Sequence, residues 1–443
     1  MADTGSEKKK SDFRYATGDA RVPWAAVGEH VWHEDLMGLI RLLVKPGADQ
    51  AGFEGAMATI EEALGELCAC GTPVPKLSLG DTVKRLEEEV ASFLGCKYAC
   101  FVTNATAGFQ IGHQFADLGP GDEVILPAIT FIATGVYPPL VGAKCVFADI
   151  DPRTVNMDPA DVARKVTDRT KVIMPVHIGG YPVDMDPIME IAAERDITVI
   201  EDAAHAFGGK YKGRMIGTIG HFGSFSFHEV KNITAFGEGG IVCTDTEFGE
   251  YFNQARFCGV DMSQQIENWL YDVVALPTTT GGPQVPGNHS STEIQAACLL
   301  GQLGRLEEII RVRRERAEYL SGRFAEVPGL VPAPLNTDEI ESTFHLYLLQ
   351  VEPEVLGGDM REFKQRLTDK GVTNIPHFAP LYHFKLYRQL GYDTDAIAQS
   401  CPNAEEVFWH RFTHLPLYPL ADAQVELMAD LVIEAAEEMK AGG

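Results

Sequence analysis

Residues 171 to 205, KVIMPVHIGGYPVDMDPIMEIAAERDITVIEDAAH, hold two short apolar runs with a helical pattern between them. The runs KVIMPVH and ITVIEDAAH have the length and composition of buried strands, and DMDPIMEIAAERD has helical spacing. Strands that are apolar throughout and alternate with helices indicate a sheet buried on both faces. The stretch therefore predicts one strand–helix–strand unit of a parallel α/β sheet.

The same alternation extends in both directions from this unit. Further strands are predicted at EVILPA, KCVFADI, GSFSFH and GGIVCTD, and further helices at DPADVARKV and at TVKRLEEEVASFLG, which ends at Gly95. We expect a large α/β domain over residues 76–300. Residues 301–443 repeat the alternation on a smaller scale and predict a second, smaller α/β domain.

Three more segments complete the predicted layout. The chain begins with a polar tail, and HEDLMGLIRLLV and MATIEEALGELCAC then predict a helical extension, so that residues 1–75 form a separate N-terminal part. The stretch from Ser291 to Val327 has helical spacing throughout and predicts one long helix.

Bulk composition excludes several classes of function. The 443-residue chain has a net charge of -26, which argues against nucleic acid or an anionic membrane surface as a partner. The sequence contains no window of about 18 consecutive apolar residues, so we expect no transmembrane helix. The nine cysteines show no zinc-site spacing, and several, such as Cys145 and Cys298, lie in apolar runs. We expect free, buried thiols, a cytoplasmic location and no metal site.

Polar residues that end predicted strands are the first candidates for function, since ligands bind at the carboxyl ends of strands in α/β sheets. They include His177, Asp202, His205 and the run from Ser226 to Lys231. Asp202 follows an apolar strand, where a structural salt bridge or a helix cap is the alternative to a functional role.

Lys231 is the second strong candidate, against the alternative of a solvated surface lysine. It follows an alternating strand, precedes the flexible GEGG, and lies 29 residues beyond Asp202, close to the length of one strand–helix–strand unit. A lysine in a partly desolvated pocket becomes a nucleophile toward carbonyls. A lysine paired with an aspartate that protonates a pyridine nitrogen is the arrangement of pyridoxal phosphate chemistry.

A phosphate group and an aromatic ring also need partners. The segment VTNATAGFQIG offers the amide of Ala105 and the hydroxyl of Thr106 at a helix start, where an ordinary N-cap is equally consistent with the pattern. Ser226 is a second phosphate donor, and Phe131 is a candidate to stack on a ring or to pack in the core. No Gly-x-Gly-x-x-Gly or Walker loop supports a nicotinamide or nucleoside-triphosphate site.

From about Leu77 onward the chain resembles the DegT/DnrJ/EryC1/StrS group of fold-type I aminotransferases, which act on keto-sugars and cyclitols. GPGDEVILPAITFIAT, VIEDAAHAFGGKYKG, SFSFHEVKNITAFGEGG and NHSSTEIQAACLLGQL are among the motifs that carry the resemblance. It implies pyridoxal 5'-phosphate attached to Lys231 and a homodimer with shared active sites. It also implies that Asp202 pairs with the cofactor's pyridine nitrogen, that His205 contacts the side of its 3-hydroxyl, and that Phe131 stacks on its ring. The residues that it implies for phosphate binding are Ala105, Thr106 and Ser226, with Asn288 reaching the phosphate from the neighbouring subunit.

The chain departs from the family pattern at three places. Ala105 stands where the family usually has glycine, Ser290 stands where it often has a substrate-facing arginine, and the segment from about 30 to 75 is longer than usual and a candidate cover for the acceptor site. The resemblance implies transfer of an amino group from L-glutamate or L-glutamine to a keto-sugar, nucleotide-linked or not, or to a keto-cyclitol. A dehydratase or lyase on the same fold and a non-catalytic regulator are the alternatives; relatives that dehydrate sugars have histidine at the position of Lys231.

Overall fold

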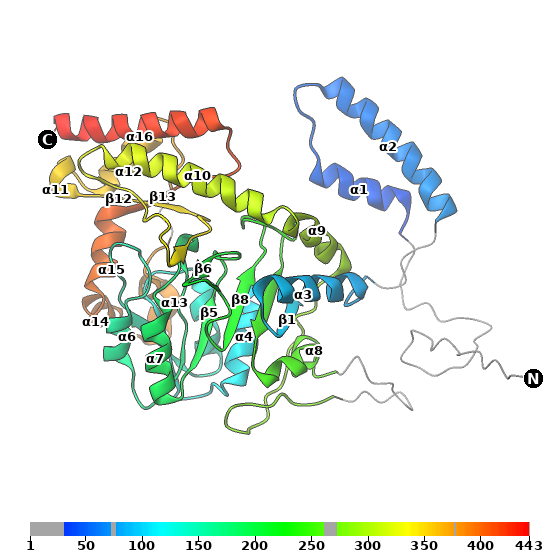
Figure 1. Cartoon of the computed structure of the whole chain (residues 1–443), viewed down its shortest axis with the longest axis horizontal. Helices are drawn as coiled ribbons and strands as arrows, with labels where there is room; N and C mark the ends of the chain where they lie inside the picture. Colours follow the sequence, from blue (N-terminus) through cyan, green and yellow to red (C-terminus); the bar gives the residue numbers. More distant parts are fainter. Residues whose placement is uncertain (1–30, 72–76, 261–272, 376–377, 443) are drawn as a thin grey trace, which may run out of the picture.

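The computed structural model describes residues 31–71, 77–260, 273–375 and 378–442. The polar start of the chain, predicted as a tail, lies outside these residues. The described chain forms an α/β body with a helical hairpin beside it (Figure 1).

A seven-stranded sheet with the order β1-β9-β8-β5-β4-β2-β3 forms the centre of the body. Its strands are β1 (Tyr98–Val102), β2 (Glu123–Pro127), β3 (Lys144–Ala148), β4 (Thr170–Ile173), β5 (Thr198–Asp202), β8 (Phe222–Ser226) and β9 (Gly240–Thr244). Strand β9 is antiparallel to both of its neighbours, and the other pairs are parallel. The prediction of a mainly parallel sheet is therefore confirmed.

The two faces of this sheet are buried in separate apolar cores, as continuous apolar strands require. In β5, Val199 contributes to one core and Ile200 to the other. Helices α3 (Asp81–Leu94) and α7 (Met185–Arg195) cover one face, and α4 (Ala105–Phe115) covers the other. Helix α3 ends at Gly95, whose φ of 71° is the left-handed conformation of a helix C-cap.

A third core lies under the C-terminal part of the chain. There β10 (Leu330–Val331), β12 (Tyr347–Val351) and β13 (Phe412–Leu415) form an antiparallel sheet. Helices α10 (Leu306–Ala325), α12 (Met360–Asp369) and α16 (Asp422–Gly442) contribute apolar side chains to the same core. The domain limits after residues 75 and 300 stay predictions.

The single long helix expected from residue 291 onward is two helices, and that expectation was wrong. Helix α9 (Glu293–Leu303) ends at Gly304, and α10 starts at Leu306. The break lets α9 pack on α3 while α10 packs on α16. Helical spacing continues through both segments, so periodicity alone does not reveal the change of direction.

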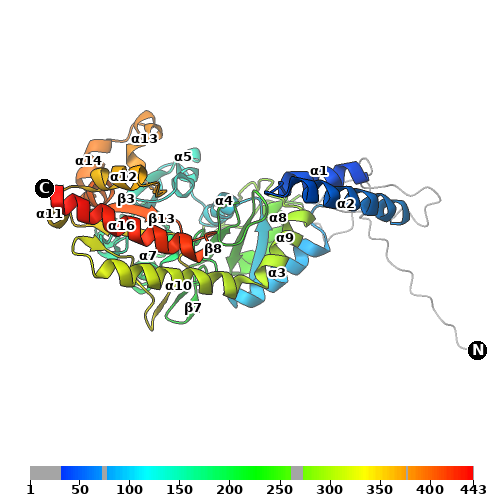
Figure 2. The same ribbon diagram turned by 90° about the horizontal axis from the view of Figure 1, so that it is seen from above.

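The helical extension predicted before residue 75 forms a hairpin of α1 (His33–Leu43) and α2 (Gln50–Cys70). Figures 1 and 2 both show it projecting beyond α8 and α9. In the described part of the chain, no helix is long and apolar enough to cross a membrane. All nine cysteines are free; Cys145 is buried as predicted, whereas Cys298 is only partly buried.

Short elements connect the main ones. They are α5 (Tyr137–Leu140), α6 (Pro159–Lys165), β6 (Lys210–Tyr211), β7 (Arg214–Met215), α8 (Phe252–Arg256), β11 (Ile340–Glu341), α11 (Pro353–Leu356), α13 (Lys385–Gln389), α14 (Thr394–Gln399) and α15 (Pro402–Glu406), with the short helical turns η1 (Ile132–Gly135), η2 (Ile178–Gly180), η3 (Glu247–Tyr251), η4 (Leu381–His383) and η5 (Val407–Arg411).

Candidate active site

Asp202 and the segment that carries Lys231 lie at the same edge of the large sheet. Asp202 is the last residue of β5 and pairs in register with Ser224 of the parallel neighbour β8. Lys231 follows β8 in the next loop. The charges of the two side chains affect each other's pKa, so the structure brings these two predicted residues together.

Asp202 is a buried carboxylate held by two donors. Its Oδ2 accepts a hydrogen bond of 2.7 Å from Thr134 Oγ1, and its Oδ1 accepts one of 3.1 Å from the backbone N–H of Ala204. Burial raises the pKa of Asp202, while Thr134, Ala204 and Lys231 oppose that rise. Among the described residues no cation lies within ion-pair distance of it, so a protonated ring nitrogen fits the charge that is missing there.

Lys231 has an amine that is easily deprotonated. Its side chain is partly buried, and this burial lowers its pKa to about 8, although the charge of Asp202 acts in the opposite direction. Its backbone N–H donates a 2.9 Å hydrogen bond to His228 O. Near pH 8 a large fraction of such a lysine is neutral and nucleophilic, unlike a solvated lysine.

The glycines after Lys231 permit close backbone contacts. Gly237 has a φ of 133° and accepts a 2.9 Å hydrogen bond from Glu229 N, which closes the loop. A Cβ on Gly240 would lie 2.3 Å from the carbonyl carbon of Asn104. Glycine at 240 therefore lets β9 start directly against the turn that precedes α4.

The start of α4 is the predicted phosphate cradle. Asn104 is its N-cap, and Asn104 Oδ1 accepts a 3.0 Å hydrogen bond from Ala107 N. The Ser224 hydroxyl donates to Ala105 O at 3.0 Å and fixes the helix start against β8. The methyl group of Ala105 is part of the apolar core, so the departure from glycine does not fill the cradle. Thr106 is partly buried beside it.

Ser226 ends β8, and its Oγ accepts a 3.3 Å hydrogen bond from His228 N. It is partly buried, unlike Ser224 on the same face of the strand. The two hydroxyls on this face of β8 thus differ: that of Ser224 fixes α4, and that of the predicted Ser226 lies at the sheet edge.

Aromatic side chains line one side of the group. Phe131 is 57% exposed, and its ring lies edge-on to Phe378 with centroids 6.1 Å apart. Phe378 stacks on His205 at 5.7 Å, and His205 lies 4.5 Å from His345. His205 Nδ1 accepts a 3.3 Å hydrogen bond from Gly179 N, which fixes the orientation of the imidazole.

Three further residues belong to this group and were not predicted. Thr134 contacts Asp202, and Asn232 Oδ1 lies 3.1 Å from His345 Nδ1. Burial lowers the pKa of His345 well below its usual range. Asn232 could have been found as the neighbour of Lys231. His345 comes from the C-terminal part of the chain and has no local signal.

The side chains of two predicted residues contact other partners, although the backbone N–H of His177 donates a 3.2 Å hydrogen bond to Asp202 O. His177 is buried with its Nε2 3.2 Å from Glu201, whose oxygens also accept the N–H groups of Gly217, Ile219 and Gly220, so His177 has a structural role. Asn288 is exposed, and its Oδ1 accepts bonds from the N–H and hydroxyl of Ser290, at 3.1 Å and 2.8 Å. Its contribution to a neighbouring subunit stays a prediction.

Comparison with known proteins assigns this arrangement to a family. Residues 69–432 match the model of the DegT/DnrJ/EryC1/StrS aminotransferase family. The chain is 37% identical to the spore coat polysaccharide biosynthesis protein SpsC of Bacillus subtilis over 378 residues, which cover 83% of this chain and 91% of that protein. It is 32% identical to 3-amino-5-hydroxybenzoate synthase of Amycolatopsis mediterranei over 365 residues, with coverages of 80% and 91%.

A solved structure agrees with these matches. A protein of Streptococcus pneumoniae assigned as a sugar aminotransferase, in its PMP form, superposes with a TM-score of 0.73 at 29% identity, covering 84% of this chain and 94% of that one. Its PLP form gives a TM-score of 0.72. The chain belongs to the DegT/DnrJ/EryC1/StrS aminotransferase family and is a pyridoxal-phosphate-dependent aminotransferase.

Proposed function

We propose that this enzyme moves an amino group from L-glutamate or L-glutamine to a ring ketone of a sugar, nucleotide-linked or free, or of a cyclitol. The observation that carries the proposal is the partly buried Lys231, with a pKa lowered to about 8, at the same sheet edge as the buried Asp202. The names of two relatives, a polysaccharide biosynthesis protein and an aminohydroxybenzoate synthase, support a ring compound as the acceptor.

The residues present fit the cofactor. The buried carboxylate of Asp202 has no ion-pair partner among the described residues, and α4 offers backbone N–H groups beside Thr106 and Ser226. Phe131 offers an exposed aromatic ring, and His205 offers an imidazole that contacts the rings of Phe378 and His345. Pyridoxal phosphate, when bound, supplies an aldehyde that takes up the amino group and a ring that delocalises the electrons left on the donor's α-carbon.

Two side chains of the enzyme perform the proton chemistry in this proposal. Lys231 would hold the cofactor through the aldehyde carbon, with loss of water. Once the donor's amine has taken its place, the freed amine of Lys231 would take the proton from the donor's α-carbon and pass it to the cofactor carbon that had carried the aldehyde. The carboxylate of Asp202 keeps the ring nitrogen protonated, and Thr134 and the Ala204 N–H keep that carboxylate ionised and oriented. The same lysine reverses the proton transfer for the acceptor.

The acceptor must be recognised locally. With a net charge of -26, the protein repels an anionic acceptor at long range, so a nucleotide-linked sugar needs positive groups at the site itself. At position 290, where relatives often have arginine, Ser290 has its hydroxyl bound to Asn288. An acceptor without a phosphate group at that position is the better match to this chain.

The active enzyme is, in this proposal, a homodimer with shared sites and a cytoplasmic location. The free state of all nine cysteines supports a reducing compartment. The exposed position of Asn288 supports a contribution to a second subunit.

The visible absorption spectrum of the purified enzyme with pyridoxal phosphate tests the donor. L-Glutamate or L-glutamine should shift the band of the bound cofactor to that of the pyridoxamine form, with release of one equivalent of keto acid. A band that ignores both donors overturns the proposed donors. With a candidate acceptor, release of product without keto acid supports the lyase alternative instead, and the absence of any band supports the regulator alternative.

A further inference from the structure

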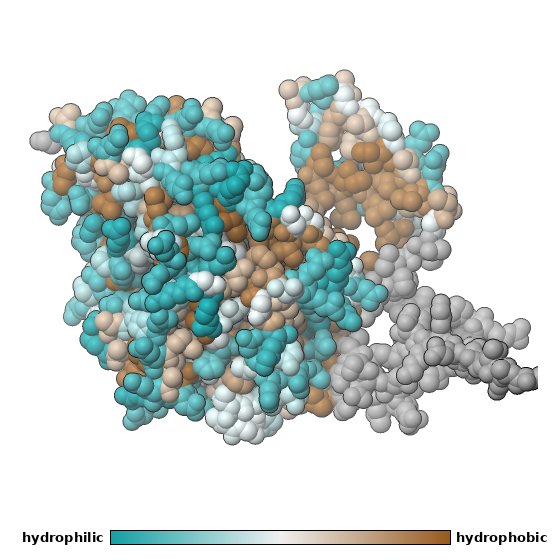
Figure 3. Space-filling view, in the orientation of Figure 1, coloured by the Kyte–Doolittle hydropathy of each residue, from teal (hydrophilic) through white to brown (hydrophobic). Residues whose placement is uncertain are grey.

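The α1–α2 hairpin, residues 31–71, leaves an apolar surface open in the single chain. On α1 this surface includes Trp32, Leu39 and Leu43, which are 60%, 45% and 55% exposed. On α2 it includes Ile60 and Leu67, which are 37% and 59% exposed. Figure 3 shows these helices forming one broad apolar patch. We call this patch the arm face.

The side chains of the arm face recur at positions that lie on one side of each helix. The α1 set is Trp32, Leu36, Leu39 and Leu43, and the α2 set is Phe53, Met57, Ile60, Leu64 and Leu67. A spacing of three and four residues is that of helices packed against other helices or apolar surfaces. Met57, in the middle of the α2 set, is already buried within the hairpin, and the exposed members of the two sets, Trp32, Leu39, Leu43, Ile60 and Leu67, are those left for burial against something outside it.

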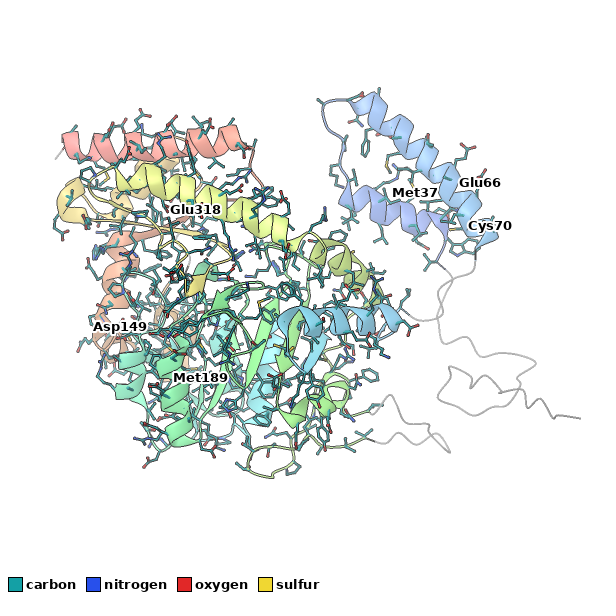
Figure 4. All side chains as sticks on the ribbon, in the orientation of Figure 1. Met37, Glu66, Cys70, Asp149, Met189 and Glu318 are labelled. Carbon is teal, nitrogen blue, oxygen red and sulfur yellow. The ribbon has the colours of Figure 1, made fainter. Side chains whose placement is uncertain are left out.

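The hairpin alone has little to hold it together. Only Met37 and Met57 are buried, each 3% exposed, and Figure 4 places Met37 between the two helices. One ion pair, between Arg41 and Glu61 at 3.2 Å, joins α1 to α2. Apart from their contact with each other, neither helix has a substantial contact with another described helix or strand. Since isolated helices of this length are marginal in water, a second surface is needed to stabilise them.

A second open apolar surface surrounds the Lys231 loop. Val230, Phe236 and Ile294 are 62%, 58% and 51% exposed. The loop is joined to α9 by hydrogen bonds from Gln295 Nε2 to Glu238 O, at 2.6 Å, and from Gln302 Nε2 to Thr234 O, at 2.6 Å. We call these three residues the rim. A polyhydroxylated acceptor finds no hydrogen-bonding partner in their side chains, whereas an apolar helix face does.

The chain connects the hairpin to the body beside the rim. Leu77 O accepts a 3.1 Å hydrogen bond from Glu293 N, next to Ile294. Gly71 and Leu77 are six residue steps apart, so an extended chain between them spans at most about 22 Å. In a two-fold dimer closed at the rim, each hairpin thus starts at the interface and can reach the other copy.

We propose that the arm face docks on the rim of a second copy of this chain, so that each α1–α2 hairpin covers its partner's Lys231 site. The proposal rests on the proposed homodimer and adds its surface. The single chain has both surfaces available and leaves both exposed, and the hairpin projects away from the body (Figure 2). An arm and a rim on every copy make a self-complementary, closed interface.

Charge and family comparison agree with this assignment. Lys45 lies at the end of the α1 stripe and the rim loop carries the exposed Glu229 and Glu238, so this end of the arm face is opposite in charge to the rim. The match to the family begins at residue 69, after most of the hairpin. The family model therefore does not describe most of the arm.

Cysteine cross-linking between differently tagged copies tests the contact. The exposed Cys68, Cys70 and Cys258 are first changed to serine. One copy then carries Leu43→Cys and the other Ile294→Cys, and the two are co-expressed and oxidised. The expected result is a disulfide-linked pair of one copy of each kind, which is absent when Leu140→Cys, on the exposed surface outside both patches, replaces Leu43→Cys.

Three other results overturn the proposal. A Leu43→Cys homodimer alone shows that hairpins pair with each other. In a chain that carries both substitutions, a disulfide within the single chain, seen as faster gel migration without a linked pair, shows that the arm covers its own rim. No cross-link, together with rapid hydrogen exchange throughout α1, shows that the arm has no docking surface.

Self-association gives a second measurement that needs neither donor nor acceptor. Leu39→Glu with Leu43→Glu should weaken the dimer by about a hundredfold, since two large apolar side chains lose their burial. Leu140→Glu, a change of the same kind at a 77% exposed position, should leave it unchanged. Sedimentation that is the same for both variants overturns the proposal and leaves the proposed aminotransfer reaction untouched.

Discussion

The Lys231 site and the α1–α2 hairpin differ in how far a single chain completes them. In the site, Asp202 is buried with a donor on each oxygen, and the start of α4 is fixed by Asn104 and Ser224. In the hairpin, two buried methionines and one ion pair hold the helices together, and most of the apolar residues face outward.

This difference separates the residues that carry out the reaction from the surfaces that cover the site. The reactive groups are preorganised by the body of one subunit, which is where the family match lies. What surrounds the mouth of the site, the rim and the arm, is left open and needs another surface. Changes in the body should therefore alter the reaction, and changes in the hairpin should alter assembly.

The largest effect is expected from Lys231→Ala. The change removes both the covalent attachment point and the proton carrier, so turnover should fall by about 10⁴-fold or more. Keto acid release from the donor measures it. Lys144→Ala, at an exposed lysine on the edge strand β3, is the matched control and should keep full activity. Multiple turnovers by Lys231→Ala without added amines would contradict the assignment of Lys231.

Asp202→Asn should have the next largest effect, a fall of about 10³-fold in both half reactions, because the ring nitrogen loses its anionic partner. The variant also tests the coupling within the site. The charge of Asp202 raises the pKa of Lys231 against the lowering effect of burial. Without that charge, the pKa of Lys231 should fall further below its present value of about 8.

Uptake of pyridoxal phosphate by the cofactor-free protein measures that shift. The neutral lysine reacts, so the rate of uptake should rise with pH through about 8 in the unchanged protein. In Asp202→Asn the rise should occur at lower pH. An identical midpoint in both proteins would show that the two groups do not interact.

Thr134→Val should have a smaller effect with a definite sign. The Thr134 hydroxyl lowers the pKa of Asp202, so its removal raises that pKa. The acid limb of kcat/KM for the donor should move to higher pH, with a loss of about tenfold on that limb. Thr130→Val is the matched control, because the Thr130 hydroxyl bonds to Thr134 Oγ1 at 3.0 Å and not to Asp202. Equal pH profiles for both variants would contradict the role of Thr134.

Local patterns in the sequence were sufficient to predict where the residues that follow strands lie in the candidate site. Apolar runs placed the ends of β5 and β8, and Asp202 and Lys231 came with them. The glycines at 237 to 240 predicted close approach, which Gly240 makes to Asn104. The placement of these residues could be predicted because the carboxyl ends of parallel strands meet at one edge, while their roles toward the cofactor stay predictions.

Contacts between distant segments could not be predicted in the same way. His345 reaches His205 from 140 residues further along the chain, and only the packing of the C-terminal sheet brings them within 4.5 Å. The end of α9 at Gly304 was missed because helical spacing continues beyond it. The hairpin was predicted as helical, but its exposed face follows from tertiary contacts that it does not make.

Substitution of two buried methionines compares the stability of the body and of the hairpin directly, and it is the prediction with the smallest expected effect on activity. Met174 is fully buried in the core of the large sheet, and Met57 is 3% exposed between α1 and α2. Met174→Ala should lower the free energy of unfolding of the body by about 2–5 kcal/mol, since it leaves a cavity in a packed core. Met57→Ala should change that free energy by less than about 0.5 kcal/mol, since α2 has no substantial contact with the described body.

Denaturant unfolding, monitored by far-ultraviolet circular dichroism, measures the main unfolding transition of each variant. Hydrogen exchange in α1 and α2 measures the hairpin, where Met57→Ala should remove protection. A loss from Met57→Ala as large as that from Met174→Ala would show that the hairpin unfolds together with the body. In that case the arm could not be a separate, docking element, and the contrast between a site whose Lys231 and Asp202 are held by one chain and an arm that depends on a second copy would no longer hold.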